Sequence, residues 1–233
     1  MGEPAAEPAS GTLPDTQVRA MFDRIAHVYD RMNSLMTAGM HHRWRERAAD
    51  VARVGPHSRA LDVATGTGDL AIELAGRGAS VTGMDFAPAM LEIARRKAPG
   101  IEFEQGDALS LRYADAAFDA VTVGFGARNF ADLDRGLAEM ARVTKPGGRV
   151  VVLEITTPQR APLSWFFRGW FDHAVPALGR LADSDAYTYL PSSVRRFPAP
   201  KELAARMAAA GLADVGWILT GGGIIALHHG TRR

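Results

Sequence analysis

Two glycines and an aspartate follow an apolar run and form the first group of residues that could do chemistry. Gly66 and Gly68 come directly after Ala60–Ala64, and Asp69 begins a segment of helical character. A short run rich in leucine and valine is typical of a buried strand. Glycine permits a sharp turn and leaves room for a ligand beside the backbone. The spacing therefore predicts a strand, a tight turn and a helix that form a nucleotide-binding corner.

The residues of this turn differ from the glycine fingerprint of dinucleotide-binding enzymes. Ala71 stands at the third glycine position, and the acidic Asp69 opens the helix. A carboxylate there would repel a pyrophosphate, which a helix N-terminus otherwise attracts. A cationic or neutral adenosyl ligand is compatible with Asp69. The alternative is a turn that only connects a strand to a helix, and a single G-x-G motif does not decide between the two.

Two further acidic residues end the next two predicted strands. Asp85 lies 17 residues after Gly68, about the spacing at which an acidic residue reaches a ribose in nucleotide-binding folds. Its carboxylate can accept hydrogen bonds from both ribose hydroxyls, and it is also a candidate N-cap for the helix Pro88–Lys97. Asp107 is a candidate acceptor for an adenine amino group. Its alternative is an ordinary loop aspartate.

A fourth site follows the fourth predicted strand. Gly124 and Gly126 precede Ala127-Arg128-Asn129, and two glycines in such a place indicate backbone that passes close to a ligand. The four sites end successive strands. Because the carboxyl ends of parallel strands meet at one edge of the sheet, we expect the four sites to lie together.

The central region alternates between strands and helices, which implies a parallel sheet. Proline begins the helix after the second strand, where it is well tolerated. The expected strands are Arg59–Ala64, Ser80–Asp85, Ile101–Gln105, Phe118–Val123 and Arg149–Ile155. The expected helices between them are Asp69–Ala75, Pro88–Lys97 and Leu133–Val143, with a turn at Lys145–Gly148.

Helical segments flank this alternation. Residues 1–14 are rich in Pro, Ala, Gly and Glu and are predicted to be a disordered tail. Residues 15–56 are expected to form two helices that cover the mouth of the pocket. Apolar residues recur at spacings of three and four in the first helix. They are Phe22, Ile25, Tyr29, Met32 and Met36, and the second helix is predicted over His42–Val54.

The alternation ends after Glu154. Residues 157–200 are interpreted as a helical insertion over the site, with an apolar helical face over Pro162–Leu178. A helix over Pro200–Ala210 is capped by Gly211. The strands Ala213–Thr220 and Ile224–Gly230 are expected to form a closing antiparallel hairpin. Residues 15–233 thus form one domain.

Composition excludes several functional classes. The chain has 233 residues, 47% of them hydrophobic, and a net charge of +1, so no strong field for nucleic acid is indicated. The mean hydropathy of −0.08 is that of an ordinary globular protein. The absence of cysteine excludes disulfides, thiolate metal sites and a cysteine nucleophile. We find no signal peptide and no apolar run long enough to span a membrane.

Taken together, the four sites resemble those of a seven-stranded S-adenosylmethionine-dependent methyltransferase. Several segments are further similar to the quinone C-methyltransferases of menaquinone and ubiquinone biosynthesis, and the similarity extends from about Val18 to Gly230. The most specific are Met21–Asn33 and the G-x-R-N of Phe125–Asn129. The others are Leu61–Asp69, Lys145–Gly148, Tyr187–Val194 and Ala226–Gly230.

The resemblance implies a fold and a cofactor. The fold is α/β, with a seven-stranded, mostly parallel, doubly wound sheet of Rossmann-like type, a C-terminal antiparallel hairpin and an N-terminal helical cover. The cofactor is S-adenosyl-L-methionine. The implied cofactor-binding residues are Thr67, Asp85, Asp107 and Ala108. The glycine turn adds Gly66 and Gly68 as candidates, and the first helix adds Tyr29.

Two positions depart from the pattern of this family. Gly124 stands where many members have a serine whose hydroxyl contacts the cofactor, so that contact is missing. Asp107 stands where many members have asparagine. The carboxylate can still accept from adenine, but it has no amide proton to donate. Both departures concern the details of cofactor binding.

The implied reaction is methylation of a carbon on a reduced, prenylated quinol such as demethylmenaquinol. The ring carbon attacks efficiently only if the neighbouring phenol loses its proton, so the site needs a base or a stabiliser of phenolate. The candidate catalytic residues are Arg128 and Asn129. Arg128 stays cationic, and its alternative is an ion pair with Asp132. His27 and Asp30 are further candidates for the base.

Other interpretations remain open at this stage. Tyr29 and Asn33 share a helical face and either line the pocket or pack the helix. The adjacent pairs His41-His42 and His228-His229 are poorly spaced for metal binding. The Pro162–Leu178 face either contacts a membrane or packs in a core or a homodimer.

The competing functions are a benzoquinol C-methyltransferase of the ubiquinone pathway, another small-molecule methyltransferase, and an inactive scaffold of a quinone-synthesis complex. The expected location is the cytoplasm, with peripheral contact to the inner face of the membrane.

Overall fold

The structure is a computed structural model that describes residues 15–158, 161, 163–169 and 185–233. The predicted tail over residues 1–14 and much of the predicted helix Pro162–Leu178 lie outside the described residues. Among the described residues, no helix combines the length and the apolar character needed to cross a bilayer.

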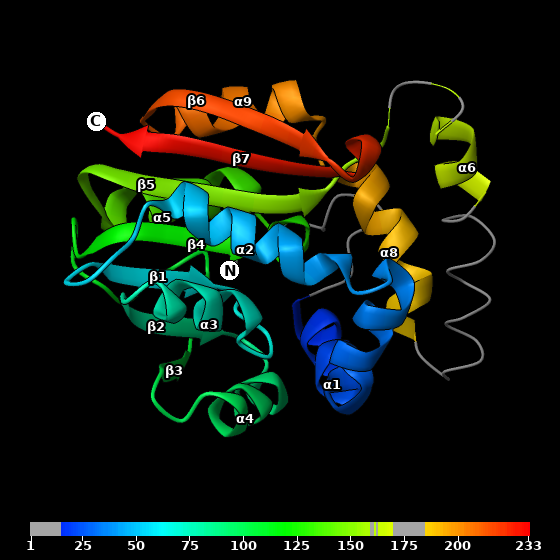
Figure 1. Ribbon diagram of the computed structural model, residues 1–233, viewed down its shortest axis with the longest axis horizontal. Helices are drawn as coiled ribbons and strands as arrows, with labels where there is room; N and C mark the ends of the chain where they lie inside the picture. The colour runs from blue at the N-terminus through cyan, green and yellow to red at the C-terminus, as the bar shows by residue number, and fades with distance from the viewer. Residues whose placement is uncertain (1–14, 159–160, 162, 170–184) are drawn as a thin grey trace, which may run out of the picture.

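A seven-stranded sheet forms the centre of the protein (Figure 1). Its spatial order is β3-β2-β1-β4-β5-β7-β6. Strands β1 to β5 are parallel, and β7 is antiparallel to both β5 and β6. This confirms the predicted fold class. The strands are β1 (Arg59–Val63), β2 (Ser80–Asp85), β3 (Glu102–Gln105), β4 (Phe118–Gly124), β5 (Thr144–Ile155), β6 (Leu212–Thr220) and β7 (Ile225–Arg232).

Helices cover both faces of the sheet. On one face, Trp44, Leu74 and Leu91 pack in one core cluster with β5 and β7. On the other face, Leu137 and Met207 pack in a second cluster. Strands covered on both faces read as nearly continuous apolar runs. The first face carries α2 (Met40–Ala52), α3 (Asp69–Gly76) and α4 (Pro88–Lys97), and the second carries α5 (Leu133–Val143) and α9 (Pro200–Ala209).

The helix α1 (Asp15–Thr37) lies beyond the carboxyl ends of the parallel strands, together with α8 (Asp185–Arg196) and α6 (Leu163–Gly169) (Figure 1). Met21 and Ile25 of α1 pack against Met90 of α4 and against Ala87, the residue before it, and Tyr189 of α8 packs on the same cluster. The apolar periodicity of the first helix therefore serves to cover the edge of the sheet where the four predicted sites end.

One local prediction needs refinement, and another is confirmed. The turn at Lys145–Gly148 is part of β5, where the pairing with β4 shifts its register between Phe118 and Ala120. Gly147 has a φ of +79° there, and a side chain at Gly148 would come within 2.7 Å of the Asp119 carbonyl oxygen. The irregular turn is thus absorbed into the strand as a bulge. The predicted cap at Gly211 is confirmed by its φ of +93°.

Candidate active site

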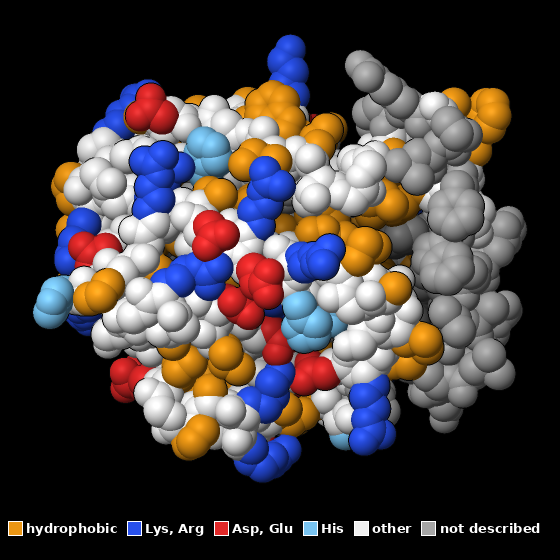
Figure 2. Space-filling view, viewed as in Figure 1, with side chains coloured by type: hydrophobic (Ala, Val, Ile, Leu, Met, Phe, Trp, Pro, Cys, Tyr) orange, Lys and Arg blue, Asp and Glu red, His pale blue; other side chains and the backbone are white. Residues whose placement is uncertain are grey.

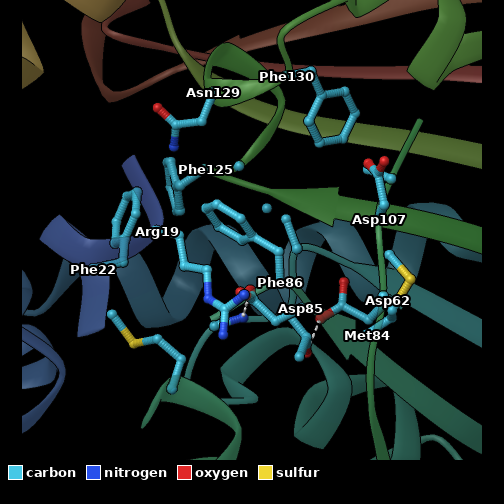
Figure 3. Close-up of a pocket in the computed structure, with 18 of the residues that line it drawn as sticks. Arg19, Phe22, Asp62, Met84, Asp85, Phe86, Asp107, Phe125, Asn129 and Phe130 are labelled. Atoms are coloured by element: carbon cyan, nitrogen blue, oxygen red, sulfur yellow. Dashed lines mark hydrogen bonds between the residues drawn. The ribbon is translucent and has the colours of Figure 1, made fainter. Parts of the chain in front are cut away.

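A cavity of about 520 Å³ opens at the carboxyl ends of β1 to β4. The four stretches singled out in the sequence all line it, and α1 covers it with Arg19, Phe22 and Tyr29. Figure 3 shows side chains from these separate elements converging on one space. The predicted cofactor-binding residues at its wall are Tyr29, Gly66, Thr67, Asp85, Asp107 and Ala108.

Asp85 is fixed at the end of β2 by backbone donors. It is only 5% exposed, and its Oδ2 accepts from the Gly66 amide at 2.8 Å while Oδ1 accepts from the Ala87 amide at 2.9 Å. An ionised carboxylate can accept about four hydrogen bonds, so capacity remains for two donors from the cavity. The N-cap of α4 is Ala87, so the predicted capping role of Asp85 is wrong. Its carboxylate instead ties two strand ends together.

The two glycines of the turn have different tasks. Gly66 has a φ of +58°, and a side chain there would meet no atom within 4 Å, so its position faces open space. Gly68 has a φ of +85°, and a side chain there would approach the Phe103 ring to 2.9 Å. Gly66 therefore keeps the cavity open, whereas Gly68 permits packing against β3. The predicted cofactor residue Gly68 does not itself line the cavity.

Asp107 is held in an exposed turn after β3. Its Oδ1 accepts from the Leu109 amide at 2.8 Å, and both Asp107 and Ala108 line the cavity. A side chain at Gly106 would run into the Met84 sulfur at 2.5 Å. Met84 can therefore lie beside the turn and form part of the cavity wall only because Gly106 has no side chain.

Asp62 is a cavity residue that the sequence analysis missed. It sits within β1, is 1% exposed, and accepts from the hydroxyls of Thr65 and Thr122 at 2.6 Å each. Burial raises the pKa of its carboxyl to about 6, although both hydroxyl donors oppose the rise. Burial likewise raises the pKa of Asp85 to about 6. The sequence did contain a signal for Asp62, because an acidic residue within an apolar strand is unusual and indicates a special role.

Thr67 belongs to a network that joins α1 to the glycine turn. Its hydroxyl donates to Asp30 Oδ1 at 2.7 Å, and Lys97 Nζ contacts Asp30 Oδ2 at 2.9 Å. Lys97 also pairs with Asp69. Asp30, proposed as a base, is thus committed to these two partners. His27, the other candidate base, is exposed and does not line the cavity.

Arg45 is a second residue that the sequence analysis missed. It belongs to α2, is 6% exposed and lines the cavity. Its guanidinium lies 5.3 Å from the centre of the Phe125 ring and 3.5 Å from Asp69 Oδ2. It also contacts His41 Nδ1. Nothing in the local helical pattern distinguishes Arg45 from the exposed arginines of the same helix.

Arg128 has a different partner from the one predicted. Its Nη1 lies 2.8 Å from Glu154 Oε1, with both side chains buried. Asp132, the partner weighed in the sequence analysis, instead caps α5 by accepting from the Arg135 amide at 3.0 Å. The predicted pair with Asp132 is therefore wrong. Arg128 does not line the cavity, because its guanidinium is directed toward the end of β5.

Asn129, the neighbour of Arg128, does line the cavity. Its Oδ1 is buried and has no hydrogen-bond partner within the described structure. A buried carbonyl oxygen without a partner costs free energy unless a ligand supplies a donor. Figure 3 shows Asn129 at the rim near Phe125. Asn129 Oδ1 is therefore able to accept a hydrogen bond from a donor on a ligand in the cavity.

Some of the other predicted residues line the cavity and others do not. Tyr29 lines the cavity and packs edge-on against Phe22 at 6.2 Å, whereas Asn33 does not line the cavity. Within the described residues, no group of three or more His, Asp and Glu side chains is placed to hold a metal ion. The His228 Nε2 instead hydrogen-bonds the Pro200 carbonyl oxygen at 2.9 Å.

The raised pKa of Asp62 has a testable effect on stability. An acid whose pKa is higher in the folded state loses stability as pH rises, because the unfolded chain gives up the proton first. Between pH 4.5 and 7.5 we expect Asp62→Asn to gain about 1 to 3 kcal/mol in unfolding free energy relative to the wild type, since each pKa unit is worth about 1.4 kcal/mol. Urea unfolding at several pH values measures this. A difference that does not change with pH would contradict the burial of an ionisable Asp62.

Known proteins share this sequence and fold. A model of the ubiE/COQ5 methyltransferase family matches residues 11–232. The demethylmenaquinone methyltransferase of Thermus thermophilus is 49% identical over 220 residues, covering 91% of this chain and 100% of the relative. The demethylmenaquinone methyltransferase of Deinococcus radiodurans is 50% identical over 202 residues, covering 83% of this chain and 84% of the relative.

Solved structures with lower sequence identity share the fold. The [4+2]-cyclase SpnF superposes with a TM-score of 0.71 at 18% identity, covering 95% of this chain and 97% of that one. A Thermotoga maritima protein described as an S-adenosylmethionine-dependent methyltransferase has a TM-score of 0.64 at 21% identity, covering 92% and 99%. These likenesses establish the fold. Since the family model and the full-length relatives agree, the chain belongs to the ubiE/COQ5 methyltransferase family.

Proposed function

We propose that this methyltransferase transfers a methyl group from S-adenosyl-L-methionine to a ring carbon of demethylmenaquinol, in menaquinone biosynthesis. The relatives named demethylmenaquinone methyltransferase support this substrate, because they match along almost the whole chain. The observation that carries the proposal is one cavity with acidic acceptors at one end and the unpartnered Asn129 oxygen at the other.

The cavity residues fit S-adenosylmethionine. Asp85 would accept from the ribose hydroxyls with its remaining capacity, and Asp107 would accept from the adenine amino group. The open space over Gly66 leaves the backbone accessible. When bound, the cofactor supplies an electrophilic methyl group on a sulfonium. No pyrophosphate has to be accommodated, so the acidic Asp69 at the start of α3 is no obstacle.

Asn129 would bind the quinol hydroxyl. Its buried Oδ1 can accept a hydrogen bond from the quinol hydroxyl, and its amide group can donate a hydrogen bond to the phenolate once that hydroxyl has lost its proton. Holding the hydroxyl fixes the position of the neighbouring ring carbon, and such positioning can supply much of a rate enhancement. An amide donor inside a cavity stabilises a developing negative charge more strongly than water does.

We assign Arg128 a positioning role in this reaction. Its side chain links the turn Ala127–Asn129 to the end of β5 through Glu154, and the Arg128 amide also donates to Glu154 Oε2 at 3.3 Å. Because Asn129 is the next residue, this buried pair fixes the backbone that carries the amide. Removing one member of a buried pair leaves an uncompensated charge, so Arg128→Ala would disturb Asn129 indirectly.

Transfer of labelled methyl tests the substrate. The purified chain should methylate reduced demethylmenaquinol, and it should methylate the benzoquinol counterpart of the ubiquinone pathway at least about tenfold more slowly, which corresponds to about 1.4 kcal/mol in the transition state. Extraction of the labelled quinone measures both rates side by side. Transfer only to the benzoquinol would move the enzyme to the other pathway. Failure with both acceptors, despite cofactor binding, would overturn the proposal.

Substitutions at the two ends of the cavity should have different effects, one on cofactor binding and the other on methyl transfer. Asp85→Ala should weaken binding of S-adenosylhomocysteine by about 100-fold or more, because two hydrogen bonds to a charged group are lost at about 1.5 to 3 kcal/mol each. Asn129→Leu, of similar size, should leave that affinity within about threefold and lower the transfer rate by about 100-fold. Calorimetry and the transfer assay measure the two effects. Loss of cofactor affinity in Asn129→Leu would remove its role at the acceptor.

Peripheral contact with a membrane would give the enzyme access to a prenylated substrate. Trp165 of α6 is 66% exposed, and Leu35 and Met40 are exposed beside the α1–α2 turn. These residues lie beyond or beside the carboxyl ends of the parallel strands (Figure 1), the end of the sheet whose residues line the cavity. An apolar tail that stays in lipid could reach the cavity from this side. Trp170 and Phe171, assigned to the same face in the sequence analysis, lie outside the described residues.

Sedimentation with anionic vesicles tests this contact. Trp165→Asp combined with Leu35→Asp should reduce bound protein at least about fivefold, since each charged side chain opposes insertion into lipid. Trp217→Asp, on the edge strand β6 with a 41% exposed tryptophan, is the matched control and should bind as the wild type does. Unchanged binding of the double variant would contradict membrane contact. A fall in molecular mass by light scattering would assign the same patch to a homodimer.

A further inference from the structure

Phe125 has a backbone conformation that its residue type rarely adopts. Its φ is +60°, in the left-handed region where a bulky side chain is an outlier. A glycine would adopt this conformation without strain, so phenylalanine at this position costs free energy. Strained residues of this kind persist only where the surrounding structure holds them, and they are common at functional sites. The Phe125 side chain is therefore a candidate for a direct role.

Hydrogen bonds from a neighbouring strand and from the following turn hold this backbone in place. The Phe125 amide donates to the Leu153 carbonyl oxygen of β5 at 2.8 Å. The Phe125 carbonyl oxygen accepts from Arg128 Nη1, and the same Nη1 donates to Glu154 of β5. Both backbone polar groups of Phe125 are thus paired, and the end of β5 fixes the direction in which its side chain leaves the backbone.

The Phe125 ring is supported from α2. Its centre lies 6.3 Å from that of the Trp44 ring, in an edge-on arrangement, and 5.3 Å from the guanidinium carbon of Arg45. Trp44 is buried, and Figure 2 shows acidic and basic side chains intermingled over the outside of the molecule in the region of α1, α2 and α3. The ring is therefore packed against α2 beneath a charged surface, and it also lines the cavity.

The turn that carries Phe125 lies between the cofactor end and the acceptor end of the cavity. Strand β4 is the neighbour of β1, and a side chain at Gly126 would come within 2.6 Å of the Cβ of Ala64, which leads into the glycine turn. The Asn129 amide donates to the Gly126 carbonyl oxygen at 3.0 Å, and Figure 3 shows Phe125 next to Asn129. With the cofactor ribose at Asp85 and the acceptor hydroxyl at Asn129, the Phe125 ring lies where donor and acceptor have to meet.

Methyl transfer to carbon constrains the orientation of the acceptor ring. The electrons that form the new bond belong to the π system, so the methyl group has to approach one face of the ring. A hydrogen bond to Asn129 holds one hydroxyl but leaves the ring free to tilt about that contact. A second contact, made with the flat surface of the ring, would remove this freedom, and orientation of this kind can supply much of a rate enhancement.

We propose that the Phe125 ring packs against the aromatic ring of the quinol and holds it in the orientation needed for attack on the methyl group. This proposal rests on the function proposed above. Aromatic pairs with ring centres about 4.5 to 7 Å apart gain attraction beyond the burial of apolar area. Because β5 fixes the Phe125 backbone, the ring is in position before the quinol enters. The strained φ then has a function, since it directs an aromatic side chain toward the acceptor.

Substitutions that keep or remove the aromatic ring test this contact. Phe125→Leu should raise the KM for reduced demethylmenaquinol about fivefold or more and lower kcat as well, because an aliphatic side chain does not provide the aromatic attraction. Phe125→Gly removes the ring and suits the left-handed backbone, and it should raise the KM at least as much. Phe125→Tyr keeps the ring and should stay within about twofold of the wild type in both constants. Initial rates of labelled methyl transfer at several quinol concentrations measure KM and kcat.

A phenylalanine at the opposite end of the same strand is the matched control. Phe118 begins β4, is buried and packs edge-on against Tyr113 at 5.0 Å, and it does not line the cavity. Phe118→Leu should lower the melting temperature and leave the KM for the quinol unchanged. A rise in KM equal to that of Phe125→Leu would show a general loss of packing and overturn the assignment.

Cofactor affinity separates a contact with the acceptor from a contact with the cofactor. Calorimetry should show that Phe125→Leu binds S-adenosylhomocysteine within about threefold of the wild type. A fall in this affinity as large as the rise in KM would assign the ring to the cofactor and overturn the proposal. An unchanged KM in Phe125→Leu, or equal rises in Phe125→Leu and Phe125→Tyr, would overturn it too. Failure of the wild type to methylate demethylmenaquinol would instead defeat the proposed function.

Discussion

The hydrogen bonds of the Asp85 carboxylate hold the site together. One oxygen accepts from Gly66 in the turn after β1, and the other accepts from Ala87 before α4. Two strand ends and two helix starts are thereby fixed around a single buried group. The Gly66 turn needs a positive φ to present its amide, which is why glycine and aspartate have to occur together. The same carboxylate keeps free acceptor capacity toward the cavity, so the group that fixes the architecture also binds the ligand.

Charge is distributed unevenly around the cavity. Asp62 and Asp85 are buried with hydroxyl and amide donors, and burial raises the pKa of each to about 6. Asp69 has Arg45 and Lys97 beside it, and its pKa is lowered. Acceptors without a cation suit neutral hydroxyl groups, while a cation beside an anion suits a zwitterion. The cavity wall therefore differs in chemistry between the end of β2 and the turn that follows β1.

The helix α1 closes the site by two kinds of contact. Its apolar face packs against Ala87 and Met90 at the start of α4. Its polar residues Asp23 and Asp30 reach the Ala89 amide and the Thr67 hydroxyl, at 3.1 and 2.7 Å. Asp23 thereby satisfies an amide in the first turn of α4, which has no partner within the helix, and Asp30 contacts the turn that precedes α3. These contacts therefore fix the position of α1 relative to the starts of α3 and α4, next to the cavity.

The sequence alone determined the alternation of strands and helices, the glycine turn, Asp85 at a strand end and the closing hairpin. Each of these features depends on local periodicity or on residues that are near one another in the chain. Only the tertiary structure decided that Arg128 pairs with Glu154, 26 residues away, and that Arg45 faces Asp69 across two helices. Such partners are set by how helices dock on the sheet. Local spacing does not reveal how the elements dock. An arginine at a buried helical position cannot be distinguished from one at an exposed position until the neighbouring element is known.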